Sequence, residues 1–207
     1  MDKGLIEYID DHDVIKNGSP KDLWVYNKLK LSKFLGYKCG NRNKTPVFGK
    51  EYVVRPQQNP DGMGVGAKII KLTQENFEET VKEGYFWCEK FEGRHLSHDF
   101  EYGINKLTVE GVRDSKSPLW KWTRWVKVKD RIELPQFLKP QAQYYRWINF
   151  ESIGGNIIEV HLRPNKDFLN TTYTEVVPIW SGQEVNPPAG YKFVKAQDYK
   201  RIGFYVK

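Results

Sequence analysis

Three polar residues at two-residue spacing are the strongest chemical feature of the sequence. Glu159, His161 and Arg163 lie in the otherwise largely apolar segment 157–164. Residues two apart on a β-strand share one face, so these side chains would project together. Burying such groups is costly unless they hold something. A carboxylate suits Mg²⁺ and an arginine suits a phosphate, so the segment predicts a strand that carries a functional site.

A second strand would lie beside the first. Gly154-Gly155-Asn156 separates two strand-like segments, 148–153 and 156–162, and is typical of a hairpin turn. Asn149 and Glu151, again two apart, would then add an amide and a carboxylate to the polar face.

A glycine-rich turn, 57–67, contains Gly62, Gly64 and Gly66. Backbone N–H groups of such a turn can surround phosphate oxygens, and Arg55, at the end of the preceding strand, would lie beneath them. The turn is neither a Rossmann fingerprint nor a P-loop, since no helix follows and no Gly-Lys-Ser/Thr ends it. The alternative interpretation is that the glycines form an ordinary hairpin tip and that Arg55 is an ordinary exposed arginine.

The segment Cys88-Glu89-Lys90-Phe91-Glu92-Gly93 runs from a predicted strand directly into a turn. Backbone groups at such a point can face the edge of an adenine, and a carboxylate beside them can accept a ribose hydroxyl or an adenine amino hydrogen. A simple ion pair at the strand end is the alternative interpretation.

Tryptophans alternate with basic residues between positions 120 and 131. Trp120, Trp122 and Trp125 lie among Lys121, Arg124, Lys127, Lys129 and Arg131. Three interpretations remain open: an amphipathic strand with its aromatic face in the core, the wall of a substrate pocket, or a platform for single-stranded nucleic acid.

Taken in chain order, these segments resemble the ATP-grasp family of carboxylate ligases. The resemblance covers roughly residues 24–165. The segments that carry it are Asn27-Lys28, Val53-Val54-Arg55-Pro56, Asp61-Gly62-Met63-Gly64-Val65-Gly66, Trp87-Cys88-Glu89-Lys90-Phe91-Glu92-Gly93 and Ile158-Glu159-Val160-His161-Leu162-Arg163-Pro164.

The resemblance implies an ATP- and Mg²⁺-dependent reaction that joins a small-molecule or peptide carboxylate to an amine or thiol through an acyl phosphate. It assigns the nucleotide to Lys28, Arg55, Gly62, Gly64, Gly66, Glu89, Lys90 and Phe91, with Glu92 or His95 near the ribose. It assigns the metal to Glu159, His161, Glu151 and Asn149. Catalytic roles fall to Arg163, Arg55 and Arg124, the last together with the tryptophans as an acceptor wall.

Three positions depart from the family pattern. Arg55 replaces a lysine, His161 replaces a metal-binding asparagine, and Asn149 stands where the family has an acid. Only 27 residues precede Lys28, so the resemblance implies a compact form without the usual N-terminal substrate domain, of the kind a virus or mobile element carries. The missing domain favours a homodimer or a protein partner. An inactive nucleotide-binding descendant is the alternative within the family, and a non-catalytic nucleic-acid-binding module is the alternative outside it.

Composition limits the other classes of protein. The 207 residues are 39% hydrophobic and 14% aromatic, which excludes general disorder. No apolar run approaches the ~18–20 residues that cross a bilayer. Two cysteines and an acidic N-terminus without a secretory pattern predict reduced thiols in the cytoplasm. A net charge of +7 favours anionic partners.

The elements that must position these residues are mainly strands. We expect helices at 23–36 and 73–84, a hairpin over 51–72, and strands near 85–91, 94–103, 106–112, 120–134, 148–162 and 173–206. Hairpins dominate the second half, so the fold class is α+β with mostly antiparallel sheets. The predicted organisation is an extension (1–22), a small subdomain (23–93) and a larger one (94–207).

Overall fold

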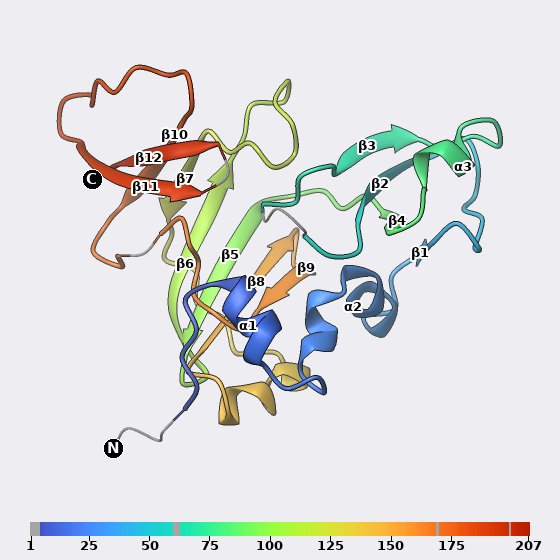
Figure 1. The fold of residues 1–207 in the computed structure, drawn as a ribbon, viewed down its shortest axis with the longest axis horizontal. Helices are drawn as coiled ribbons and strands as arrows, with labels where there is room; N and C mark the ends of the chain where they lie inside the picture. The colour runs from blue at the N-terminus through green and yellow to red at the C-terminus, as the bar shows by residue number, and fades with distance from the viewer. Residues whose placement is uncertain (1–4, 60–62, 169, 199) are drawn as a thin grey trace.

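A computed structural model describes residues 5–59, 63–168, 170–198 and 200–207. Two antiparallel sheets and several short helices make up the molecule, which confirms the α+β class (Figure 1). The small sheet has the strand order β1-β4-β2-β3, and the large sheet has the order β11-β12-β10-β7-β6-β5-β8-β9. Figure 1 shows the small sheet on the right and the large sheet on the left, with the N-terminal helices in blue below them.

The small sheet consists of β1 (Cys39–Gly40), β2 (Glu51–Pro56), β3 (Lys68–Lys71) and β4 (Tyr85–Glu89). The large sheet consists of β5 (His95–Glu101), β6 (Ile104–Val112), β7 (Arg124–Lys127), β8 (Trp147–Ile153), β9 (Asn156–His161), β10 (Glu175–Trp180), β11 (Lys192–Asp198) and β12 (Arg201–Val206). The helical elements are α1 (Asp11–Asn17), η1 (Leu23–Tyr26), α2 (Lys28–Phe34), α3 (Phe77–Thr80), η2 (Gln136–Leu138) and η3 (Gln141–Gln143).

The predicted helix at 23–36 is two elements. Asn27 separates η1 from α2, and its side chain accepts the Lys30 N–H at 2.9 Å, which caps α2. The predicted helix at 73–84 contains only the four residues of α3. Thr73 and Asn76 exchange side chain–backbone hydrogen bonds at 2.9 and 3.3 Å, and this local turn takes the place of the first helical turn.

Strand alternation places apolar and polar residues of β8 on opposite faces. Ile148 and Phe150 enter a core with Val14, Val25 and Leu31 of the N-terminal helices. The intervening residues of β8, Asn149 and Glu151, face the opposite way from this core, and this alternation fixes the orientation of the predicted polar face. None of the described helices is long and apolar enough to cross a lipid bilayer.

Candidate active site

A cavity of about 820 Å³ lies between the two sheets, a volume typical of sites for small molecules. The small sheet contributes side chains of β2, β3 and β4, and the large sheet contributes those of β5, β6, β8 and β9. Residues of α1 and α2 close one side. The segments that sequence analysis singled out far apart in the chain therefore border a common space.

Glu159 on β9 is the centre of a buried charged network. The Lys28 Nζ lies 3.2 Å from its Oε2, and the side chains are only 3% and 13% exposed. Asn59 Nδ2 donates to Glu159 Oε1 at 2.5 Å, and Asn59 Oδ1 accepts a hydrogen bond from Lys28 Nζ. Burial alone would raise the pKa of Glu159, but the cationic Lys28 and His161 outweigh burial and hold this pKa well below its usual range. Glu159 is therefore a carboxylate held between cations.

His161 lies between two carboxylates. Its Nε2 is 3.3 Å from Glu159 Oε1, and its Nδ1 is 3.0 Å from Asp11 Oδ1. Burial and the Arg163 guanidinium lower the pKa of His161, but the two carboxylates outweigh them and raise it to about 9. At neutral pH the ring is therefore an imidazolium with both N–H groups donated to carboxylates.

Arg163 follows β9 and meets the same N-terminal residue. Its Nη2 donates to Asp11 Oδ2 at 2.5 Å, and Tyr26 Oη donates to Asp11 Oδ1 at 3.1 Å. The Arg163 Nε is buried and has no hydrogen-bond partner within the described part of the chain. The sequence pattern predicts only an extension for the N-terminal segment and no role for Asp11, Tyr26 or Asn59. No spacing or motif in the sequence marks these contacts.

Glu151 and Asn149 have different surroundings although they share a strand face. Glu151 is directly opposite Glu159 in the β8–β9 register, lines the cavity, and contacts His95 Nε2 at 2.8 Å. Asn149 is buried, and its Nδ2 donates to Ser97 Oγ and Asp99 Oδ1, each at 2.8 Å. The structure therefore brings Glu151 to the cavity and keeps Asn149 away from it within the described residues.

Arg55 connects the two sheets. From β2 of the small sheet, its Nη2 donates to the Ile158 carbonyl of β9 at 3.0 Å. Its Nε is also buried without a hydrogen-bond partner in the residues that the structure describes. A guanidinium with an unused donor at the cavity wall can bind an additional anion.

Five of the remaining predicted nucleotide residues border the cavity, four from the small-sheet side and His95 from β5 of the large sheet. Glu89, Lys90, Phe91, His95 and Gly64 line the cavity. Glu89 Oε1 accepts the Lys38 N–H at 2.8 Å, and Lys90 pairs with Glu51 at 3.0 Å.

Other predicted residues lie elsewhere. The Glu92 side chain is 83% exposed, and Gly66 packs near Tyr85. Arg124 pairs with Glu175 at 3.5 Å. None of Glu92, Gly66 and Arg124 is among the cavity-lining residues in the described ranges. Gly62 lies outside the described residues.

The three tryptophans do not form an exposed row. Trp125 is 2% exposed within the core of the large sheet, Trp122 packs on Gly111, and Trp120 packs edge-on against Trp180. All three border the cavity. The nucleic-acid interpretation required exposed tryptophans on a basic surface, and the buried position of Trp125 contradicts that requirement. The predicted strand 120–134 is correspondingly short and contains only β7 as regular structure.

Gly111 allows the close packing of Trp122, so we expect Gly111→Ala to destabilise the protein. A Cβ at this position would lie 2.6 Å from Trp122 Cζ3 and 2.8 Å from Trp125 Cζ3, which neither ring can accept without moving. Overpacking of this kind costs about 1–3 kcal/mol. Denaturant unfolding measures it, with Lys106→Ala at an exposed position of the same strand as the control. An unchanged midpoint in Gly111→Ala would contradict this packing.

No family model matches the sequence, and no curated protein matches it either. Three solved structures are similar. An L-amino acid ligase from Bacillus licheniformis has a TM-score of 0.55 at 11% identity over 88% of this chain and 66% of its own. N5-carboxyaminoimidazole ribonucleotide synthetase from Thermotoga maritima has a TM-score of 0.55 at 11% identity over 88% and 67%. A protein of Archaeoglobus fulgidus described as belonging to the ATP-grasp superfamily has a TM-score of 0.52 at 13% identity over 88% and 64%.

The chain therefore spans about two thirds of the length of these proteins. At such low identity the likeness concerns the arrangement of the elements and not the reaction. Together with the two antiparallel sheets that enclose the cavity, it leads to one conclusion: this chain adopts the ATP-grasp fold.

Proposed function

We propose that this protein is an ATP- and Mg²⁺-dependent ligase that joins a carboxylate to an amine or thiol through an acyl phosphate. The observation that carries the proposal is the convergence of cations from different elements on a single cavity of an ATP-grasp fold. Lys28 comes from α2, Arg55 from the small sheet and Arg163 from the end of β9, and all three line the cavity.

The cavity suits a purine nucleotide chemically. Val53, Ile69 and Ile158 supply apolar walls beside Phe91, and Glu89 supplies a carboxylate for a hydroxyl or amino group. Beyond them, Lys28 and the unused donor of Arg55 would offset the negative charge of the phosphates.

The donor set also suits Mg²⁺, through Glu159 and Glu151. Mg²⁺ commonly uses one or two carboxylates and completes its shell with water and substrate phosphates. These two carboxylates are directly opposite one another on adjacent strands and line the cavity. No group of three potential acidic, histidine or cysteine ligands converges within the described residues, so the phosphates would complete the shell. His161 does not suit a metal ion, because both ring nitrogens face carboxylates.

The proposed chemistry needs neutralised charge more than covalent help from the protein. A carboxylate oxygen attacks the γ-phosphorus and the bond to the departing ADP breaks, after which an amine or thiol attacks the acyl carbon and inorganic phosphate leaves. Bound Mg²⁺ would neutralise the charge of the phosphates during the transfer. Lys28 and Arg55 orient the phosphates, and Arg163 holds the anion that receives the phosphoryl group.

The test has two stages. Calorimetric titration with ATP, ADP and GTP, each with and without Mg²⁺, measures nucleotide binding. Incubation with ATP, Mg²⁺, hydroxylamine and a panel of carboxylic acids then traps an acyl phosphate as a hydroxamate. We expect ATP binding that Mg²⁺ strengthens, together with hydroxamate formation. The absence of nucleotide binding at millimolar concentration would reject the proposal.

Arg55→Met should weaken ATP binding by roughly ten- to hundredfold, the effect of losing a charge-assisted hydrogen bond of about 1.5–3 kcal/mol. The substitution keeps the apolar stem and removes the donor that connects the nucleotide side to β9. Lys71→Met removes a positive charge from an exposed position of the same sheet and should leave the affinity unchanged. Equal affinities for the two variants would show that Arg55 does not contact the nucleotide.

A second candidate is a nucleotide-binding protein without turnover. It is favoured by the hydrogen bonds and ion pairs that occupy both oxygens of Glu159. The two candidates separate in the second stage of the test, because this one predicts nucleotide binding with no hydroxamate.

A further inference from the structure

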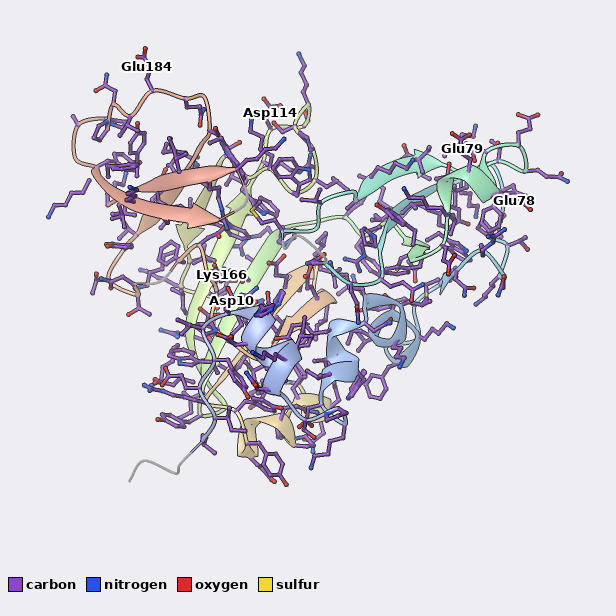
Figure 2. All side chains as sticks on the ribbon, in the orientation of Figure 1. Asp10, Glu78, Glu79, Asp114, Lys166 and Glu184 are labelled. Carbon is purple, nitrogen blue, oxygen red and sulfur yellow. The ribbon has the colours of Figure 1, made fainter. Side chains whose placement is uncertain are left out.

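The N-terminal segment places two adjacent carboxylates, Asp10 and Asp11, at the edge of the cavity. Asp10 Oδ2 is 2.8 Å from Lys166 Nζ, and Figure 2 shows these two side chains together beside α1. Asp11 accepts hydrogen bonds from Arg163 and Tyr26 and contacts His161. The two neighbouring carboxylates, Asp10 and Asp11, thus accept hydrogen bonds or ion pairs from four other residues.

These four donor residues form a site for anions rather than an ordinary surface ion pair. Arg163 and His161 are both buried, at 9% and 8% side-chain exposure, while Asp11 is 25% exposed. The buried Arg163 Nε lacks a partner within the described residues, so the guanidinium has capacity for another acceptor oxygen. We call Tyr26, His161, Arg163 and Lys166 the cation pocket.

The segment that carries the two acids is attached to the rest of the molecule on both sides of them. Before them, Glu7 pairs with Arg146 at 2.8 Å and Tyr8 packs against the core. Ile6 pairs with the backbone next to β8, and Val14 is the buried residue of α1. Between and after them, Ile9 and Ile15 are 69% and 52% exposed. Among these attachments, the contacts of Asp10 and Asp11 with the cation pocket are those that hold the segment at the edge of the cavity.

We propose that the cation pocket is a binding site for an acidic peptide, and that Asp10-Asp11 is an internal occupant which such a peptide displaces. A peptide segment with adjacent carboxylates already fits the pocket, and this fit identifies the chemistry of the ligand. The inference rests on the proposed function in one respect: the displaced segment would give the peptide access to the side of the cavity where Arg163 holds the reacting anion.

An internal occupant competes at an effective concentration in the millimolar range, so it masks binding of an external peptide. Removal of its charge should therefore expose the pocket. The probe is a fluorescein-labelled peptide, Tyr-Ile-Asp-Asp-His-Asp, with the sequence of residues 8–13. Fluorescence anisotropy with the full-length protein measures its binding in the absence of nucleotide.

The double variant Asp10→Asn, Asp11→Asn should bind the probe at least tenfold more tightly than the unmodified chain. Asp13→Asn is the matched control, because Asp13 lies on the same helix with only a 3.9 Å contact to His12. It should bind as the unmodified chain does. Adding Lys166→Ala to the double variant should reduce the affinity again.

Three results would overturn the inference. The first is equal affinity of the double variant and the unmodified chain for the probe, and the second is equal affinity of the double variant for the probe and for a version with Asn-Asn in place of Asp-Asp. The third is displacement of the probe by succinate as effectively as by unlabelled peptide. The last result would assign the pocket to small dicarboxylates. If the double variant does not fold, hydrogen exchange of the unmodified chain with saturating peptide replaces it. Exchange in residues 11–17 should then increase, and unchanged exchange would overturn the inference.

Nucleotide titration of the same preparations separates this inference from the proposed function. If the protein binds ATP but does not bind the peptide, the ligase proposal stands and the acidic-peptide inference is rejected. If the protein binds the peptide but binds no nucleotide, the ligase proposal is rejected and the acidic-peptide site stands.

Discussion

Glu159→Ala is expected to lower the free energy of unfolding by about 3–5 kcal/mol, the usual effect of removing one partner from a buried ion pair. For a chain of this size the melting temperature would fall by roughly 6–20 °C. The variant leaves Lys28 buried without its carboxylate, and it leaves the His161 imidazolium with one carboxylate instead of two. Differential scanning calorimetry measures the change, and Glu92→Ala, at an exposed acid, is the control.

Lys28→Met in the same background should restore part of the lost stability, because it removes the charge that Glu159→Ala leaves unpaired. A double-mutant cycle then isolates the coupling between the two residues. Additive effects would mean that the pair does not interact energetically, in disagreement with the 3.2 Å contact.

A more conservative variant of the same residue separates stability from catalysis. Glu159→Gln keeps the shape of the side chain, and under the proposed function it should abolish Mg²⁺-dependent hydrolysis or ligation by removing the negative charge. The variant should remain folded, so its activity can be compared with that of the unmodified chain at equal folded concentration. Retained activity in Glu159→Gln would remove Glu159 from the proposed metal site.

Local sequence pattern was sufficient to predict the strands that carry the site. The two-residue spacing of Glu159 and His161 and the glycine turn after β8 indicated a hairpin with a polar face, and the register has Glu151 directly opposite Glu159. Such predictions depend only on strand periodicity and turn chemistry. They required no knowledge of how the hairpin packs against the rest of the chain.

Contacts between segments that are distant in the sequence could not be predicted from strand periodicity and turn chemistry. Asp11 reaches His161 across 150 positions of sequence, from a segment whose composition indicated only a polar extension. Asn149 shares a face with Glu151, yet Ser97 and Asp99 enclose it, and strand periodicity does not tell which part of a polar face becomes buried. Alternation of tryptophan and lysine was equally compatible with core and surface, and the core position of Trp125 follows from packing against Phe168 and Phe204.

The stability of the protein is expected to fall by about 3 kcal/mol as the pH rises from about 6.5 to about 9. In the folded state the carboxylates of Asp11 and Glu159 raise the pKa of His161 to about 9, whereas an unfolded histidine titrates near its ordinary value of 6.5. The folded protein thus binds one more proton across this window. The stabilisation is complete below pH 6.5 and is lost as the pH passes through the folded-state pKa. Urea unfolding at half-unit pH intervals measures the slope.

His161→Gln should flatten this alkaline limb. It should also alter the acidic limb, because His161 lowers the pKa of both Asp11 and Glu159. Burial raises the pKa of Asp99 to about 6, so ionisation of this acid lowers stability as the pH rises toward 6. Burial lowers the pKa of His98 to about 4, so this residue has the opposite effect over nearly the same range. These two contributions oppose each other below pH 6.5. Burial also lowers the pKa of Lys28, so this residue makes stability rise with pH where it loses its proton in the folded state. The fall in stability between pH 6.5 and 9 is therefore the contribution that belongs to His161. An alkaline slope that persists in His161→Gln would therefore mean that the Asp11–His161–Glu159 arrangement does not hold an imidazolium.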